Sequence, residues 1–285
     1  MTAHLAVAED VAFVPASLEE AFEVVPGRAD RGVLLLCDHA TNIVPPEYDR
    51  LGLPEAEFER HIAYDIGCDG VTRRLAERLG APAVLSRFSR LLIDPNRGAD
   101  DPTLVMRLSD GTIVPGNHPI GADEVRARTL RFHKPYHDAI EDVLAQMTAT
   151  GMDPVVVSVH SFTSHWKGRP RPWHVGLLHD GDERAARAMI EMLRRDPDLV
   201  VGDNEPYSGA LRGDTMFTHA TRRGLGQALL EIRNDLIATA DGEREWSDRL
   251  APIIDEIARD PAQRERRLLP SRTGPYMSVD GTRIG

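Results

Sequence analysis

The segment GVLLLCDHATN, residues 32–42, joins a continuous apolar run to a polar turn that contains Asp38 and His39. A second segment, PVVVSVHS at residues 154–161, repeats this arrangement and brings His160 to the end of its run. Short apolar runs bounded by turn residues predict buried strands. Because ligands bind outside the carboxyl ends of strands in open α/β sheets, two histidines at that edge predict a metal or acid–base site. The alternative is that each histidine only caps its strand through a hydrogen bond.

Strands and helices are predicted to alternate along the rest of the chain. Strands are expected at residues 32–37, 83–85, 91–93, 154–159, 174–178 and 228–232, and helices at about 55–63, 67–79, 123–150, 183–195 and 243–259. This alternation predicts an α/β fold, a three-layer sandwich around a central mixed, largely parallel sheet. No linker or repeat interrupts the chain, so we expect a single α/β domain over residues 1–285. A loose N-terminal arm (about 1–30) and a charged C-terminal tail (about 260–285) are expected at its ends.

Composition excludes several classes of partner. The formal net charge of -11 argues against binding to nucleic acid or to an anionic membrane. No apolar stretch approaches the roughly 20 residues of a transmembrane helix, and the N-terminus lacks the pattern of a secretory signal. Cys37 and Cys68 are too few for a disulfide framework. We therefore expect a cytoplasmic protein; the sequence assigns it no oligomeric state.

His39 and His160 suit a first-row metal such as zinc, which binds neutral imidazole nitrogen. A catalytic zinc has three protein ligands and one open position, so a third ligand is needed. Asp65, which comes just before the helix predicted at 67–79, is the preferred third ligand. Alternatively, its carboxylate caps that helix by accepting hydrogen bonds from free backbone N–H groups. The other candidates for the third ligand are Asn42, Asp38 and His61.

Glu231 is predicted to be the catalytic acid–base residue. It lies inside the apolar strand predicted at 228–232, where a carboxylate is costly to bury unless it faces a polar site. Burial raises the pKa of a carboxyl group and makes it a better general base near neutral pH. The alternative is a structural ion pair with Arg233 or Arg222.

Asn96 and Arg97 follow the strand predicted at 91–93 and offer several hydrogen-bond donors. Arginine binds carboxylates through two parallel hydrogen bonds, so these residues predict a substrate with a free carboxylate. The alternative for Arg97 is a surface salt bridge. Tyr207, in the loop 204–209, is expected to bind the substrate by donating to an oxyanion, or simply to pack. His137 lies within the long helix predicted at 123–150, and its role stays open.

Seven short motifs follow one another along the chain: DHATN (38–42), YDIG (64–67), IDPNR (93–97), PYH (135–137), VHS (159–161), NEPYSG (204–209) and LEIR (230–233). Together they resemble the N-formylglutamate amidohydrolase family. The resemblance extends from about residue 34 to the last predicted helix, and it implies a phosphorylase/hydrolase-like α/β sandwich related to zinc carboxypeptidases. It also implies that His39 and His160 are zinc ligands, Arg97 binds the substrate carboxylate and Glu231 is the base.

The resulting hypothesis is a zinc-dependent amidohydrolase that cleaves the amide of a small N-acyl, N-formyl-type amino acid. The DHAT at residues 38–41 differs from the Pro-His-Ser-Gly form of the formylglutamate enzymes, which indicates a divergent branch. One alternative is a carboxypeptidase-like peptide hydrolase that uses the same site. Another is a metal-free small-molecule-binding protein on the same fold, because Asn42 replaces a carboxypeptidase-like glutamate.

Overall fold

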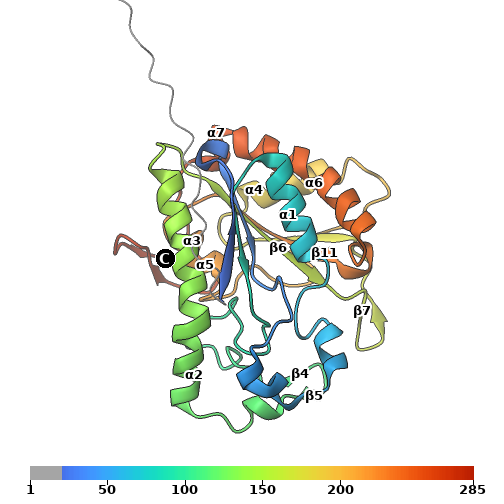
Figure 1. Cartoon of the computed structure of the whole chain (residues 1–285). Coiled ribbons are helices and arrows are strands. Elements are labelled where there is room, and N and C mark those ends of the chain that lie inside the picture. The colour runs from blue at the N-terminus through green and yellow to red at the C-terminus, as the bar shows by residue number, and fades with distance from the viewer. Residues whose placement is uncertain (1–20) are drawn as a thin grey trace, which may run out of the picture.

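The computed structural model describes residues 21–285, which include a central seven-stranded sheet with the order β1-β3-β2-β6-β11-β9-β10 (Figure 1). Strands β3, β2, β6 and β11 are parallel, β1 is antiparallel to β3, and β9 and β10 run antiparallel to β11. The predicted mixed, largely parallel sheet is therefore confirmed. Its strands are β1 (Phe22–Val25), β2 (Val33–Cys37), β3 (Ala83–Ser86), β6 (Val155–Phe162), β9 (Val175–Leu178), β10 (Val201–Asp203) and β11 (Gln227–Arg233).

Helices cover both faces of this sheet, which gives the predicted three layers. Helices α1 (Cys68–Leu79), α4 (Arg184–Leu193) and α6 (Ala240–Arg259) lie on one face, and α3 (Lys134–Thr148) lies on the other (Figure 1). Alternate side chains of a strand point to opposite faces. In β2, accordingly, Val33 and Leu35 pack with α1 and α6, whereas Leu34 and Leu36 pack with α3.

The same alternation places polar side chains at one edge of the sheet. In β6 and β11, Val159 and Leu230 face the layer of α1 and α6, so their neighbours His160 and Glu231 face the α3 side. Strands β2, β6 and β11 run in one direction, and their carboxyl ends therefore meet at the same edge. This edge carries the polar residues that the sequence singled out. His160 lies inside β6, two residues before its end, rather than beyond the strand.

The strand predicted at residues 91–93 is wrong. Leu91, Leu92 and Ile93 are fully buried but lie in a turn region, where side chains instead of a neighbouring strand bond to the backbone carbonyl groups. The carbonyl oxygen of Leu91 accepts from Asn117 Nδ2 at 2.7 Å, and that of Leu92 accepts from Arg128 Nη1 at 2.9 Å. The place beside β3 is taken by β1 instead.

Two predicted helices differ from the observed ones. The segment predicted as helix at 55–63 contains only a short 3-10 helix, Glu55–Glu59. The helix predicted at 123–150 consists of α2 (Ala122–Arg128), a π-helical segment (Thr129–His133) and α3. Other 3-10 segments are Ala29–Arg31, Pro46–Gly52, Pro115–Asn117, Thr221–Arg223 and Asn234–Leu236.

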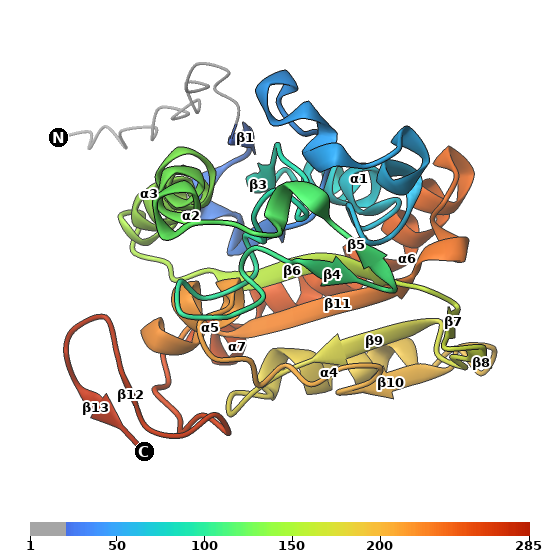
Figure 2. The same cartoon turned by 90° about the horizontal axis from the view of Figure 1, so that it is seen from below.

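Three two-stranded hairpins and two short helices complete the described chain (Figure 2). They are β4 (Leu108–Ser109) with β5 (Thr112–Ile113), β7 (His165–Trp166) with β8 (Arg169–Pro170), β12 (Tyr276–Met277) with β13 (Arg283–Ile284), α5 (Thr215–His219) and α7 (Pro261–Arg264). Within the expected tail, the hairpin of β12 and β13 lies at the periphery of the molecule (Figures 1 and 2), and Tyr276 of β12 is buried against Phe217. Residues 1–20 of the expected arm lie outside the described residues, and the arm's remaining part contains β1. Within residues 21–285, the helices are too short or too polar to span a bilayer.

Candidate functional site

A cavity of about 380 Å³ opens at the carboxyl edge of the sheet. Every residue predicted for the site lies on it. Its lining comprises His39, His61, Asp65, Arg90, Asn96, Arg97, His160, Ser161, Phe162, Thr163, Leu178, Tyr207, Ser208, Gly209, Ala210, Leu211, Asp214, Leu229 and Glu231. These residues come from strands and loops that are far apart in the sequence.

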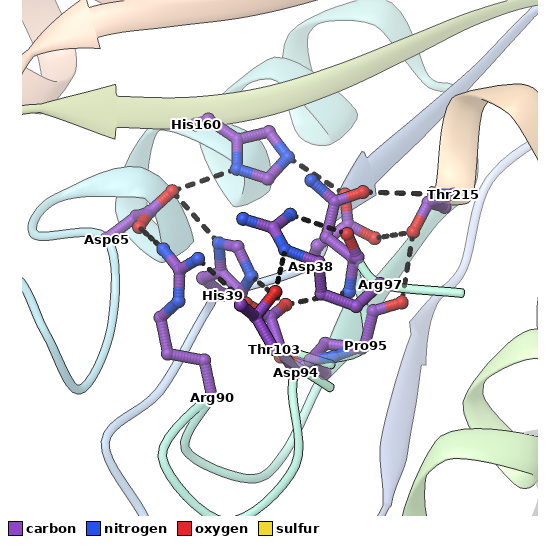
Figure 3. Close-up of polar contacts among 12 residues, drawn as sticks. Asp38, His39, Asp65, Arg90, Asp94, Pro95, Arg97, Thr103, His160 and Thr215 are labelled. Atoms are coloured by element: carbon purple, nitrogen blue, oxygen red, sulfur yellow. Dashed lines mark hydrogen bonds and ion pairs between the residues drawn. The ribbon is translucent and has the colours of Figure 1, made fainter. Parts of the chain in front are cut away.

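His39, Asp65 and His160 are brought together, all three buried (Figure 3). Oδ2 of Asp65 lies 3.3 Å from Nδ1 of His39 and 2.9 Å from Nδ1 of His160. One ligand atom from each residue lies within 4.8 Å of the other two, so the group can hold a metal ion. A backbone hydrogen bond from Asp65 N to the carbonyl oxygen of His39, at 3.0 Å, ties their two segments together.

The far side of each imidazole is bound by a second carboxylate (Figure 3). Nε2 of His39 lies 2.7 Å from Oδ1 of Asp94, and Nε2 of His160 lies 2.9 Å from Oδ2 of Asp38. Burial alone would raise the pKa of Asp38, but its hydrogen bond and charge interaction with His160 hold the pKa well below the usual range. Asp38 is therefore an acceptor, and it also accepts from Tyr136, Ser158 and Thr215.

Arg90 is a site residue that sequence analysis missed. Its guanidinium connects Oδ1 of Asp65, at 3.4 Å, with Oδ2 of Asp94, at 2.7 Å (Figure 3). Because Oδ2 of Asp65 faces the two histidines, Arg90 engages the opposite oxygen and fixes the orientation of that carboxylate. The signal available in the sequence was the spacing of four residues between Arg90 and Asp94, which allows an ion pair between them.

Glu231 lies next to His160, since the two residues are register partners in β11 and β6. Burial, together with the charge of Asp65, raises the pKa of Glu231 to about 8, although His160 acts in the opposite direction. Its Oε2 is buried with no hydrogen-bond partner among residues 21–285. The alternative ion pairs are not formed, because Arg233 pairs with Asp235 and Arg222 donates to the carbonyl oxygen of Met277.

Arg97, Asn96 and Tyr207 line the same cavity. The Arg97 guanidinium donates to the carbonyl oxygen of Asn96 at 2.8 Å and to Oγ1 of Thr103 at 3.2 Å. The amide oxygen of Asn96 accepts from Thr215 N at 3.1 Å. The Tyr207 hydroxyl accepts from Arg171 at 3.0 Å, and that guanidinium also lies over the Tyr207 ring.

The other candidates for the third ligand do not belong to this group. Asn42 donates its side-chain amide to the carbonyl oxygen of Phe58 at 2.8 Å. Asp38 lies on the opposite side of the His160 ring from Asp65, and His61 is 3.6 Å from Asp110. The capping alternative for Asp65 is wrong, because Gly67 is the N-cap residue of α1.

Asp214 is a buried carboxyl group on the cavity that sequence analysis missed. It is the N-cap residue of α5, where its Oδ1 accepts from Phe217 N at 2.6 Å. Burial raises the pKa of Asp214 to about 7, and the nearby Asp38 carboxylate adds to this effect. The polar sequence around it looks like an ordinary loop, so only the tertiary structure reveals the burial.

Fold and cavity together are those of a hydrolytic enzyme with an α/β architecture. The chain belongs to the N-formylglutamate amidohydrolase family, whose sequence profile matches residues 31–238. This range contains all the predicted site residues, and the resemblance drawn from the seven motifs is confirmed. No curated protein matches the sequence.

Two solved structures are similar to this chain. The gene product Atu2144 from Agrobacterium tumefaciens is 35% identical, with a TM-score of 0.78 over 83% of this chain and 94% of that chain. The N-formylglutamate amidohydrolase from Ralstonia eutropha JMP134 is 20% identical, with a TM-score of 0.54 over 84% of this chain and 97% of that chain. The second likeness concerns the fold alone.

Proposed function

We propose that this protein is a zinc-dependent amidohydrolase that cleaves the amide of a small N-acyl, N-formyl-type amino acid. The observation that carries the proposal is the buried group of His39, Asp65 and His160, which shares one cavity with Glu231 and Arg97. Family membership supports the hydrolytic reaction and a small amide substrate.

The donor set fits zinc in two respects. Two imidazole nitrogens and one carboxylate oxygen are common zinc ligands, and three protein ligands leave a position for a reactant. In zinc sites, moreover, a ligating histidine donates its other ring N–H to a carboxylate or carbonyl. Asp94 and Asp38 occupy that position at the Nε2 atoms of His39 and His160. When bound there, zinc polarises the amide carbonyl and makes water more acidic.

Glu231 is proposed to move the proton. Its carboxylate accepts a proton from the water whose oxygen attacks the amide carbonyl carbon, and it then donates that proton to the leaving nitrogen as the C–N bond breaks. The products are a carboxylic acid, formic acid for an N-formyl substrate, and the free amino acid. The unpartnered Oε2 and the raised pKa of Glu231 support this role, since the carboxyl group can hold or release a proton near neutral pH.

Arg97 is proposed to bind the substrate carboxylate, with Asn96 and Tyr207 as neighbouring hydrogen-bonding groups. A guanidinium offers five N–H donors and can hold a carboxylate through two parallel bonds, which fixes the orientation of the amide. The cavity volume, about 380 Å³, suits a single N-acyl amino acid and thus favours a small acid over an extended peptide.

A substrate panel with and without zinc tests the proposal. Protein treated with a chelator and then reloaded with zinc is incubated with N-formyl-L-glutamate, N-acetyl-L-glutamate and a dipeptide, and amine release is measured. Zinc-dependent release from the N-formyl compound is the expected result. Preference for the dipeptide would favour a peptide hydrolase, and an absence of bound zinc and of all turnover would favour a metal-free binding protein.

A further inference from the structure

Two histidines, one from the π-helical segment and one from α3, contact the loop that carries Arg97. His133 is the last residue of the π-helical segment, and His137 follows one turn later in α3, with ring centroids 4.3 Å apart. Nε2 of His133 lies 2.9 Å from the carbonyl oxygen of Arg97. Nε2 of His137 lies 3.0 Å from the carbonyl oxygen of Pro95. The two imidazoles thus hold the backbone on both sides of Asn96.

The acceptors determine the protonation of these rings. A carbonyl oxygen only accepts hydrogen bonds, so Nε2 of His133 and Nε2 of His137 must both carry hydrogen. Burial lowers the pKa of His137 to about 4, and the neighbouring His133 adds to this effect. Neutral His137 therefore accepts at Nδ1, where Nε2 of His219 lies 2.7 Å away and must be the donor. A chain of hydrogen bonds runs from His219 through His137 to Pro95.

The loop has no strand partner, so side chains hold it from several directions. Asn96 N donates to Oδ1 of Asp94 at 2.9 Å within the loop, and on the α5 side Thr215 contacts both the carbonyl oxygen of Pro95, at 3.3 Å, and the amide oxygen of Asn96, at 3.1 Å. The π-helical segment inserts an extra residue between α2 and α3, and such insertions are frequent at functional sites. Here the segment ends at His133, directly against the carbonyl oxygen of Arg97.

We propose that His133 and His137 are positioning residues for Arg97: they fix the backbone from which its guanidinium reaches the substrate carboxylate. The inference rests on the proposed function, which assigns the carboxylate to Arg97. It gives His137, whose role the sequence left open, a function in substrate recognition rather than in proton transfer. Displacement of Arg97 should weaken binding of the carboxylate and leave the reacting groups around His160 in place.

Both histidines are partly buried, and His133 is the better residue to test because His137 also packs against His219. In His133→Gln, the side-chain amide keeps an N–H near the position of Nε2. His133→Leu removes the donor, and His133→Asn keeps polarity with a shorter reach. The three variants are compared with the wild type and with Arg97→Lys, all zinc-loaded, on N-formyl-L-glutamate and on its analogue with both carboxylates amidated. Melting temperature and zinc content are measured for each protein.

We expect His133→Leu and His133→Asn to raise KM for N-formyl-L-glutamate by about 5- to 50-fold, as for the loss of one or two hydrogen bonds, with little change in kcat. For the amidated analogue, KM and kcat of these two variants should stay near the wild-type values. His133→Gln should have a KM for N-formyl-L-glutamate close to that of the wild type. If Arg97→Lys discriminates between the two substrates but His133→Leu and His133→Asn do not, the positioning role is overturned and the proposed function stands. If Arg97→Lys does not discriminate either, the assignment of the substrate carboxylate to Arg97 falls together with the positioning role. If the wild type neither binds nor cleaves N-formyl-L-glutamate, the proposed function is overturned as well.

Discussion

Glu231 stands directly beside His160 across two parallel strands, and both side chains face the same cavity. The parallel register of β11 and β6 makes these residues Cα partners, and partners in a sheet point to the same face. A carboxyl group with an unpartnered oxygen is therefore held next to a candidate metal ligand by backbone hydrogen bonds rather than by a flexible loop. The predicted proton transfer depends on this placement.

Glu231→Gln should abolish most of the hydrolysis and leave the fold intact. The amide has nearly the same shape but cannot accept the proton, and general acid–base assistance contributes roughly 10²- to 10⁴-fold to turnover. We expect kcat to fall by about that factor, with melting temperature and zinc content close to the wild type. Arg233→Gln, at the end of the same strand and paired with Asp235, serves as the control and should keep its activity. Retained turnover in Glu231→Gln would remove it from the mechanism, and loss of zinc would make it a ligand.

Arg97→Lys should weaken catalysis selectively for substrates with a free carboxylate. Lysine keeps the charge but cannot form two parallel hydrogen bonds. We expect kcat/KM for N-formyl-L-glutamate to fall by about 10-fold or more, equivalent to about 1.4 kcal/mol. The amidated analogue should be a poor substrate for the wild type and change little in the variant. Equal losses on both substrates, accompanied by a lower melting temperature, would indicate a role in folding.

Zinc should stabilise the chelator-treated protein through His39. A ligand that binds only the folded state, present at 100 times its Kd, adds about 2.7 kcal/mol to the free energy of unfolding. The melting temperature should therefore rise with added zinc. This rise should disappear in His39→Ala and persist in His61→Ala, a histidine on the same cavity outside the ligand group.

Asp94→Asn tests the carboxylate behind His39, whose Nε2 it contacts at 2.7 Å. Loss of such a partner weakens metal binding by about 10- to 100-fold, because the ligand's tautomer and orientation are no longer fixed. Calorimetric titration of zinc into the wild type and into the variant measures the change in the Kd for zinc. An unchanged Kd would show that Asp94 does not support the metal.

Asp214→Asn should change the pH dependence of stability. Because burial raises the pKa of Asp214 to about 7, the folded protein binds more protons than the unfolded chain between about pH 4 and pH 7. This carboxyl group therefore favours the folded state most at low pH, and its contribution falls by about 1.4 kcal/mol per pH unit across that window. Asparagine keeps the N-cap oxygen and does not titrate. Asp38, Arg97 and His160 are the charged groups that act on Asp214, and they remain in both proteins.

Urea unfolding of wild type and Asp214→Asn at pH 5, 6, 7 and 8 measures this effect. The stability of the variant relative to the wild type should increase with pH up to about 7 and then level off. Asp235→Asn, which changes a half-exposed carboxylate paired with Arg233, is the control. A difference between Asp214→Asn and wild type that does not vary with pH would contradict the raised pKa.

Local sequence was sufficient for the central strands and for the residues at their ends. The apolar runs before His39 and around Glu231 are long and continuous enough to predict buried strands, and parallel strands present their carboxyl ends at one edge. The strand predicted at 91–93 failed because a three-residue apolar run is equally stable in a buried turn. There, Asn117 and Arg128 supply the hydrogen bonds that a neighbouring strand would have given.

The sequence by itself determined the α/β class, the family and the set of side chains that can meet at the edge of the sheet. Tertiary structure decided which of them do meet. The second carboxylates behind His39 and His160, the bridge of Arg90 between Asp65 and Asp94, and the histidines behind Arg97 join segments separated by 4 to 122 positions. Hydrogen bonds of this kind depend on distances across the folded chain, which no local pattern of hydrophobicity encodes.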